Sequence, residues 1–277
     1  MPIPECSAVV DYIYHPGAAF WADHHSTTFL TASAKADLER RLPHVRTLFY
    51  RSEYSSCVKL LWEELSASFE YRNPGYAELV AWADKIDAAR YSSVEEAILG
   101  DAPALRIRAS LGDRHDPAFF ERIIRALRTE TLEDVAASAE VDEAARRVGE
   151  QIRAGLKQFE KGARLEDDGI VVFDVDGTRK IISRYAPYYV YPSARYSVGI
   201  VRSESGAKIT AMRNPWREFQ SVSLGRIFEK FGGGGHERVG AVLLPDGRAP
   251  EARQVLSRIV DEIRVEDAVN EVSGSTV

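Results

Sequence analysis

The stretch Phe20-Trp21-Ala22-Asp23-His24-His25 joins an apolar run, short enough for a buried strand, to a carboxylate and two adjacent imidazoles. Successive side chains of an extended chain point to opposite sides, so Asp23 and His25 face one way and His24 the other unless the chain turns. At the carboxyl edge of an α/β sheet, where ligands usually bind, such a triplet can address both a metal ion and its substrate. The alternative is a strand that runs into a polar turn.

The composition is that of an ordinary globular protein: 277 residues, 45% hydrophobic and 28% charged, which is long enough for two domains. The net charge of -6 argues against a surface that coats nucleic acid, although it allows a local basic cleft. The two cysteines, Cys6 and Cys57, lack metal-type spacing, which argues against disulfide scaffolding and zinc–cysteine sites. No apolar run approaches the roughly 20 residues that cross a bilayer, and no signal peptide is recognisable. We therefore expect a cytoplasmic protein with no membrane partner.

The first half of the chain is predicted to alternate short strands with helices. Asp116-Pro117 is a good helix start, with a capping carboxylate and a proline in the first turn. From Thr131 to Lys161, apolar residues recur every three or four positions after a capping box of Thr131 and Asp134, which predicts one long amphipathic helix. Two shorter helices are the alternative. Strands are predicted at residues 8–10, 18–22 and 45–50, and a further helix is predicted after Ser55 or Ser56.

The second half is predicted to be rich in short strands. Ser205-Gly206 fits a hairpin turn between two of them. The predicted strands cover residues 170–173, 188–191, 197–201, 209–212 and 241–244, and helices are predicted at 224–231 and after Pro250. The fold class is therefore α/β in two parts. The predicted division is a parallel-sheet domain at residues 1–130, a linker helix at 131–165, a smaller mixed-sheet domain at 166–266 and a disordered tail at 267–277.

Acidic residues and histidines follow three apolar segments of the first half. They are Asp11, the triplet Asp23-His24-His25, and Asp84 with Asp87. If these segments lie side by side in a parallel sheet, their ends converge on one edge. Carboxylates and imidazoles together suit manganese or magnesium. The alternatives are that Asp11 or Asp84 is a cap or turn residue, and that the last pair lies on a solvated helix face.

A second motif is the glycine run in Phe231-Gly232-Gly233-Gly234-Gly235-His236. Four consecutive glycines leave the backbone without side chains, so their amides can approach an anion closely. The imidazole of His236 adds a donor for a phosphate or carboxylate oxygen. The alternative is a flexible loop or the end of a helix.

These motifs together resemble the DHH phosphoesterase family with its C-terminal DHH-associated substrate-binding domain. The resemblance rests on Asp11, on Asp23-His24-His25, and on the glycine run followed by Arg238-Val239-Gly240, and it spans about residues 8–265. It implies a hydrolase of phosphate esters that uses two divalent ions, typically manganese, with magnesium as the alternative. It also implies a parallel-sheet DHH domain joined by a long helix to a smaller mixed-sheet α/β domain.

The resemblance also implies roles for individual residues. Arg213, at the end of a predicted strand, is in addition a candidate phosphate clamp because its guanidinium presents a fork of donors. The implied metal ligands are Asp11, His24 and Asp84, with Asp87 as the alternative to Asp84; the catalytic neighbours are Asp23 and His25; and the substrate-gripping residues are Gly233, Gly234, Gly235 and His236.

The expected partner is a small phosphorylated substrate, namely a nucleotide, a short oligonucleotide or a cyclic dinucleotide, bound in an interdomain cleft. A homodimer is left open. Aromatic residues of the second domain could stack on a base, with core packing as the alternative; they are Tyr188, Tyr189, Tyr191 and Trp216. The expected function is that of a metal-dependent phosphoesterase, and the alternative is a catalytically impaired protein of the same fold that binds a nucleotide or phosphate.

The sequence departs from the family at its start. No His-x-x-x-Asp-x-Asp motif precedes Asp11, so we expect either an N-terminally truncated DHH domain or the loss of one metal site. A competing motif, Asp174-Val175-Asp176-Gly177-Thr178, resembles the nucleophile motif of haloacid-dehalogenase-like phosphatases. That motif normally opens its domain, so a hairpin closed by Asp176-Gly177 is the preferred interpretation.

Overall fold

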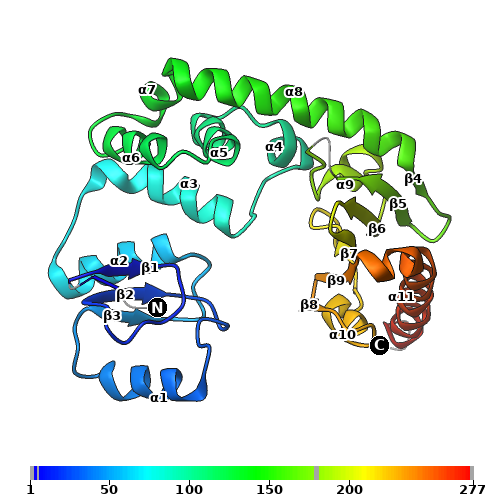
Figure 1. Ribbon diagram of the computed structural model, residues 1–277, viewed down its shortest axis with the longest axis horizontal. Helices are drawn as coiled ribbons and strands as arrows, with labels where there is room; N and C mark the ends of the chain where they lie inside the picture. The colour runs from blue at the N-terminus through cyan, green and yellow to red at the C-terminus, as the bar shows by residue number, and fades with distance from the viewer. Residues whose placement is uncertain (1–2, 5, 178–180, 275–277) are drawn as a thin grey trace. The chain divides into compact units, whose positions relative to one another are not determined.

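The computed structural model describes residues 3–4, 6–177 and 181–274, and side chains as far as residue 270 (Figure 1). Contacts divide the chain into two compact units. The first contains Met1–Tyr91 and Glu130–Asp134, and the second contains Ser92–Thr129 and Val135–Val277. The change from one unit to the other therefore falls closer to the N-terminus than the predicted boundary at residue 130. Among the described residues, no helix has the length and apolar character needed to span a membrane.

The first unit is built on a small parallel sheet, as predicted. Its strands are β1 (Ala8–Val10), β2 (Phe20–Asp23) and β3 (Leu48–Tyr50), hydrogen-bonded in the order β1-β2-β3 (Figure 1). Val10 lies opposite Ala22, and Asp23 lies opposite Tyr50. Because all three strands run in the same direction, their carboxyl ends share one edge of the sheet.

Helices α1 (Ala32–Arg41) and α2 (Cys57–Phe69) pack on opposite faces of this sheet. The alternation of side chains along β2 sends Trp21 toward Leu38 of α1 and Ala22 toward Leu60 of α2. Trp21 is fully buried, and its indole Nε1 donates a hydrogen bond to the carbonyl of Tyr12. This bond holds the turn that follows β1. The unit also contains η1 (Pro74–Tyr76) and α3 (Ala77–Asp87).

Helices open the second unit, and the predicted capping residues lie at their ends. Asp116 accepts a hydrogen bond from the amide of Ala118, and Thr131 accepts one from the amide of Asp134. In place of one predicted helix, the short α7 precedes the 24-residue α8, because Ser138 between them has an extended backbone. The helices are α4 (Val94–Leu99), α5 (Pro103–Asp113), α6 (Pro117–Ala126), α7 (Leu132–Ala137), which starts within the segment assigned to the first unit, and α8 (Ala139–Gly162).

A mixed sheet of six strands follows, in the order β4-β5-β6-β7-β9-β8. Strands β5 and β6 are parallel, and the other neighbours are antiparallel. The sheet confirms the predicted α/β class and the smaller mixed-sheet domain. Its strands are β4 (Ala163–Leu165), β5 (Ile170–Asp176), β6 (Tyr196–Ser203), β7 (Gly206–Arg213), β8 (Gly234–His236) and β9 (Val239–Pro245).

The core of the second unit lies between this sheet and two helices, α10 (Leu224–Glu229) and α11 (Ala252–Gly274). A 3-10 helix, η2 (Asp246–Glu251), leads into α11. Ile200 and Ile209, on neighbouring strands, and Ile259, on α11, are fully buried in the same cluster. On β5, Phe173 also contacts Phe159 of α8, with ring centroids 5.1 Å apart.

Two assignments made from the sequence are wrong, one strand and one hairpin turn. Residues 188–191 lie mostly in α9 (Ala186–Val190), because Pro187 suits a first helical turn and the Tyr188 hydroxyl is anchored inside the unit by Ser197. Asp176-Gly177 does not close a hairpin, because β5 continues into a parallel pairing with β6. Residue 178 of the competing phosphatase motif lies outside the described residues, and Asp174 is bonded to Arg202.

The predicted disordered tail is wrong for residues 267–274, which continue α11. Asp267 accepts hydrogen bonds from Arg195 and from the hydroxyl of Tyr196. These contacts tie the last turns of the helix to the start of β6. Residues 275–277 lie outside the described part of the chain.

Candidate metal centre

Asp11 and Asp23 are brought together because each follows or ends one of two neighbouring parallel strands. The amide of Asp11 donates to the carbonyl of Ala22 at 2.9 Å, so the pairing with β2 extends one residue beyond β1. Asp11 has a φ of 55°, in the left-handed region that residues other than glycine seldom adopt. Such conformations gather at functional sites, where the surrounding structure imposes them.

Asp23 is the buried anchor of the cluster, with 1% of its surface exposed. Its Oδ1 accepts hydrogen bonds from the amide of His24 at 2.7 Å, the amide of His25 at 3.2 Å and Nδ1 of His25 at 2.8 Å. Burial raises the pKa of this carboxyl, but hydrogen bonds from Thr28 and His25 outweigh burial and lower the pKa. The ionised carboxylate therefore fixes the backbone of both histidines and the ring of the second.

The ring of His24 is held so that one nitrogen faces two acids. Nδ1 lies 3.0 Å from the carbonyl oxygen of Tyr54, which can only accept, so this contact places the proton on Nδ1. In the neutral ring Nε2 then carries the lone pair, and this atom lies 3.5 Å from Oδ1 of Asp11 and 3.7 Å from Oδ2 of Asp87. Among the described residues, this buried nitrogen has no hydrogen-bond partner.

Asp87, not Asp84, lies against His24. Asp87 stands in the last turn of α3, and its pKa is raised first by burial and then by the negative charge of Asp11. Asp84 turns elsewhere: its carboxylate accepts hydrogen bonds from Ser55 at 2.7 Å and Ser56 at 2.6 Å. Those bonds leave Asp84 in a structural position, so the sequence alternative, Asp87, replaces it as the candidate ligand.

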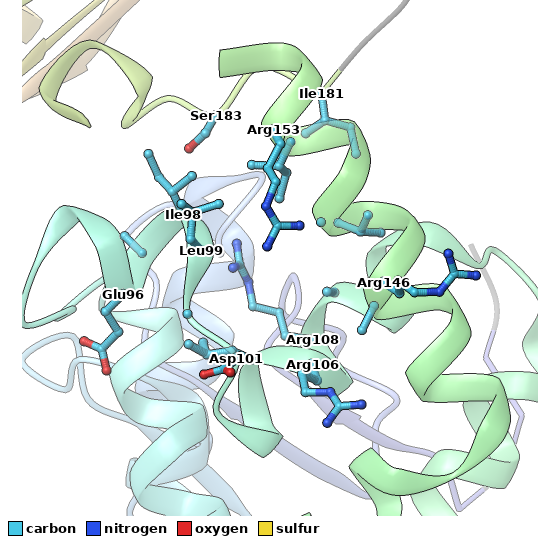
Figure 2. Close-up of a pocket in the computed structure, with 18 of the residues that line it drawn as sticks. Glu96, Ile98, Leu99, Asp101, Arg106, Arg108, Arg146, Arg153, Ile181 and Ser183 are labelled. Atoms are coloured by element: carbon cyan, nitrogen blue, oxygen red, sulfur yellow. The ribbon is translucent and has the colours of Figure 1, made fainter. Parts of the chain in front are cut away.

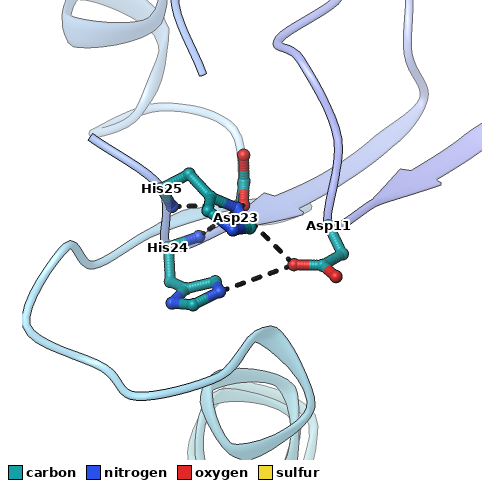
Figure 3. A group of neighbouring side chains, drawn as sticks. All are labelled: Asp11, Asp23, His24 and His25. Atoms are coloured by element: carbon teal, nitrogen blue, oxygen red, sulfur yellow. Dashed lines mark hydrogen bonds and ion pairs between the residues drawn. The ribbon is translucent and has the colours of Figure 1, made fainter. Parts of the chain in front are cut away.

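The arrangement fits a divalent cation. One ligand atom from each of Asp11, Asp23, His24 and His25 lies within 4.8 Å of the others. Figure 3 shows these four side chains gathered together. An imidazole nitrogen with a free lone pair and two nearby carboxylates repel one another unless a cation lies between them. Oxygen and imidazole ligands suit manganese or magnesium. An outer hydrogen bond from Nδ1 to a carbonyl is also the usual support of a metal-binding histidine.

His25 has a different environment from His24. Its side chain is half exposed, and the hydrogen bond to Asp23 raises the pKa of its imidazole; the charges of Asp23, Asp11 and Asp87 add to this effect. Because Nδ1 is used by Asp23, Nε2 is the nitrogen available to a ligand. His25 is thus suited to donate a proton or a hydrogen bond.

Arg213 does not present its guanidinium to a ligand. Its exposed fraction is 4%, and it donates hydrogen bonds to the carbonyls of Asn214 and Phe219. The guanidinium also lies 4.4 Å from the centre of the Phe219 ring. This environment contradicts the expectation of a phosphate clamp, because the guanidinium is buried and its N–H groups donate to backbone carbonyls inside the fold.

The glycine run forms the edge strand β8 (Gly234–His236) and the turn before it. A Cβ atom on Gly233 would lie 2.3 Å from the carbonyl oxygen of Ala241, and one on Gly235 would lie 2.1 Å from that of Val239. Glycine is therefore required there for β8 to lie close to β9. That this segment also grips a substrate stays a prediction.

Sequence reasoning missed the groups that orient the cluster. The carbonyl of Tyr54 fixes the ring of His24, and Thr28 supports the ionised form of Asp23. Neither carries a sequence signal, because a backbone carbonyl is present at every position and a threonine near a turn is common. The spacing of Asp84 and Asp87 pointed to the helix whose last turn faces His24, and a role of that helix in metal binding stays a prediction.

The architecture and this cluster define an α/β protein with the fold of the DHH phosphoesterases, as the resemblance implied. The chain is similar in structure to the pGpG-specific phosphodiesterase PggH from Vibrio cholerae, with a TM-score of 0.73 and 16% identity over 96% of this chain and 86% of that one. It is also similar to RecJ from Thermus thermophilus, solved with Mn²⁺, with a TM-score of 0.52 and 14% identity over 88% of this chain and 45% of the RecJ chain. No family model matches the sequence, and no curated protein matches it.

Proposed function

We propose that this chain is a metal-dependent phosphoesterase that hydrolyses a phosphoester of a small nucleotide-like substrate. The observation that carries the proposal is Nε2 of His24, a buried nitrogen without a hydrogen-bond partner in the described residues that faces Asp11 and Asp87. A structural histidine would have its second nitrogen satisfied. The likeness to PggH and RecJ supports the fold on which such a site is built.

The proposed ligands are Asp11, His24 and Asp87. A divalent ion held by them would supply charge stabilisation for the phosphoryl oxygens and lower the pKa of a water molecule. Mn²⁺ is the first candidate and Mg²⁺ the second. The two carboxylates come from different elements, the end of β1 and the end of α3, so the folded first unit brings the set together.

His25 and Asp23 have the other proposed roles. Asp23 is a positioning residue, because its Oδ1 accepts hydrogen bonds from the amides of His24 and His25 and from the ring of His25. His25 is the proposed substrate-facing residue: its raised pKa increases the protonated fraction near neutral pH, so that it can donate to a phosphoryl oxygen or to the leaving group. The two residues keep the roles predicted from the sequence, and Asp87 takes the place of Asp84.

The substrate class remains the one expected from the sequence, a nucleotide or short oligonucleotide. The pGpG specificity of PggH makes pGpG a suitable first probe. The proposal does not include Arg213, because its donors are used within the second unit. Contacts of Gly233, Gly234, Gly235 and His236 with the substrate stay predictions, to be tested once turnover is established.

Mn²⁺-dependent hydrolysis of bis-(p-nitrophenyl) phosphate and of pGpG tests the proposal. We expect turnover that requires the metal and falls by at least about a hundredfold in His24→Ala, because an essential ligand is removed. His115→Ala, which removes an exposed histidine from the second unit, is the matched control and should leave the rate unchanged. Titration calorimetry should show Mn²⁺ binding to the wild type and to the control, and not to His24→Ala.

Absence of turnover by a folded chain that binds Mn²⁺ would contradict the enzyme proposal. It would support the alternative, a protein of this fold that binds a nucleotide or phosphate without hydrolysing it. Absence of Mn²⁺ and Mg²⁺ binding would contradict the metal site itself.

A further inference from the structure

The second unit contains a pocket of about 680 Å³ that none of the proposed metal ligands lines (Figure 2). Its wall comes from α4, α5, α8 and residues 181–185. Sites for small molecules commonly measure about 300 to 1,000 Å³, so this volume suits a ligand of nucleotide size. All of these segments belong to the same compact unit.

The described lining is rich in arginine. It contains five arginines against three acidic residues: Arg106, Arg108, Arg146, Arg153 and Arg184, with Glu96, Asp101 and Asp142. Several of these charged side chains already form ion pairs or hydrogen bonds within the fold. Arg106 pairs with Asp142, Arg146 donates to Glu150 at 2.9 Å, and Glu96 accepts from Ser92.

Arg108 and Arg153 are the exceptions. Neither guanidinium has a hydrogen bond or an ion pair within the described part of the chain, and Asp101 pairs with neither of them. Figure 2 shows the two guanidiniums pointing toward one another in the pocket, from α5 and α8. Gly149 leaves room for this arrangement, because its missing Cβ would lie 3.3 Å from Nη1 of Arg153. Two cations that face each other without a counter-ion repel, so an anion between them is favoured.

Arg184 lies at another part of the same wall. Its guanidinium donates to the hydroxyl of Tyr185 at 2.8 Å and lies 4.9 Å from the centre of that ring. It has no carboxylate partner among the described residues. The rest of the lining supplies an apolar surface from Ile98, Leu99, Leu105, Ile152 and Ile181. A ligand that matches the pocket therefore has an anionic group and an apolar or aromatic body.

We propose that this pocket is a second ligand site, for a phosphorylated small molecule of nucleotide size whose phosphate lies between Arg108 and Arg153. Phosphate oxygens match the planar fork of a guanidinium and form charge-assisted bonds with it. The body of the ligand lies on the apolar wall. This site is separate in its residues from the proposed metal centre and extends the function beyond hydrolysis there.

Binding of ATP, tripolyphosphate and adenosine to the full chain tests the proposal. The measurements use the Asp11→Asn variant in EDTA, so that the proposed metal centre does not retain a nucleotide. We expect saturable binding of ATP by calorimetry and a rise in Tm with ATP concentration. ATP should bind more tightly than tripolyphosphate, and adenosine more weakly than either.

Single substitutions assign the site. Arg108→Gln and Arg153→Gln should each weaken ATP binding by about tenfold or more, because a charge-assisted hydrogen bond is lost. Arg125→Gln is the matched control, since it makes the same charge change on α6 of the same unit but removes an exposed guanidinium that bonds to Glu121 at 2.6 Å and does not line the pocket. The control should change affinity by less than about twofold.

An equal loss in all three variants would overturn the proposal, because it would show attraction to general surface charge. The absence of saturable ATP binding would also overturn it. Tripolyphosphate binding as tightly as ATP would overturn the role of the apolar wall. Hydrolysis by the wild-type chain with Mn²⁺ is measured separately, so failure here is distinguishable from failure of the proposed function.

Discussion

Nδ1 of His25 lies 2.8 Å from Oδ1 of Asp23, which joins a half-exposed imidazole to a carboxylate that is almost fully buried. The contact raises the pKa of His25 and, with the bond from Thr28, lowers that of Asp23 against the effect of burial. Both shifts favour the charged pair. The same carboxylate holds the amides of His24 and His25, so a single buried group sets the geometry of the proposed metal centre.

Stability of the metal-free protein should depend on pH through this pair. A group with a raised pKa in the folded state contributes its full stability below the unfolded value, 6.5 for His25, and loses it as pH rises through the folded pKa. His25→Gln should therefore lower Tm more at about pH 5.5 than at about pH 8.5, measured in EDTA. His115→Gln is the control. A difference in Tm that is constant with pH would contradict the pairing.

The two acids of α3 should respond in opposite ways to substitution. Asp87→Asn should weaken Mn²⁺ binding by at least about tenfold, because it removes a proposed ligand. Asp84→Asn should leave Mn²⁺ affinity nearly unchanged and lower the free energy of unfolding by about 1 to 3 kcal/mol, because Ser55 and Ser56 lose a charged acceptor. Calorimetry and urea denaturation measure the two effects. The reverse pattern would restore Asp84 as the ligand.

The two cysteines should differ in reactivity. Burial raises the pKa of Cys57 to about 12, while Cys6 is exposed. The thiolate is the reactive form, so iodoacetamide at about pH 8 should modify Cys6 in the native protein and both cysteines in urea. Mass spectrometry counts the additions, and Cys6→Ser should show none in the native state. Rapid modification of Cys57 in the folded chain would contradict the burial.

Arg213 should matter for stability. Its guanidinium is buried and bonds to two backbone carbonyls, so Arg213→Gln should lower the free energy of unfolding by about 2 to 4 kcal/mol. Arg226→Gln, at an exposed position, should change it by less than about 0.5 kcal/mol. Urea denaturation compares the two variants. A stable Arg213→Gln protein with weakened substrate binding would restore the phosphate clamp.

The end of α11 should be anchored by one carboxylate. Asp267 accepts from Tyr196 at 2.9 Å and pairs with Arg195 at 2.6 Å. Asp267→Asn should lower the free energy of unfolding by about 1 to 2 kcal/mol. Asp261→Asn, which affects an exposed pair with Arg264 on the same helix, should cost less than about 0.5 kcal/mol. Equal effects in thermal denaturation would show that the anchor contributes little.

The strands of the first unit could be predicted because their signals are local. Apolar runs of the right length precede Asp11 and Asp23, and residues 45–50 contain β3. Parallel pairing then brings the carboxyl ends together without further information. The strand predicted at residues 188–191 was wrong for the opposite reason: tyrosines favour strands, but Pro187 and the burial of Tyr188 favour α9.

Which acid faces His24 could not be predicted, because Asp84 and Asp87 are one helical turn apart and differ only in what surrounds them. The burial of Arg213 and the presence of Arg108 and Arg153 in the lining of one pocket depend in the same way on contacts between distant segments. The amino-acid sequence thus determined the elements, the parallel order and the cluster of acids and histidines, since spacing and polarity are local properties. Tertiary packing decided which charged groups are satisfied inside the fold and which remain free for a ligand, because burial and hydrogen-bond partners are set only when distant segments meet.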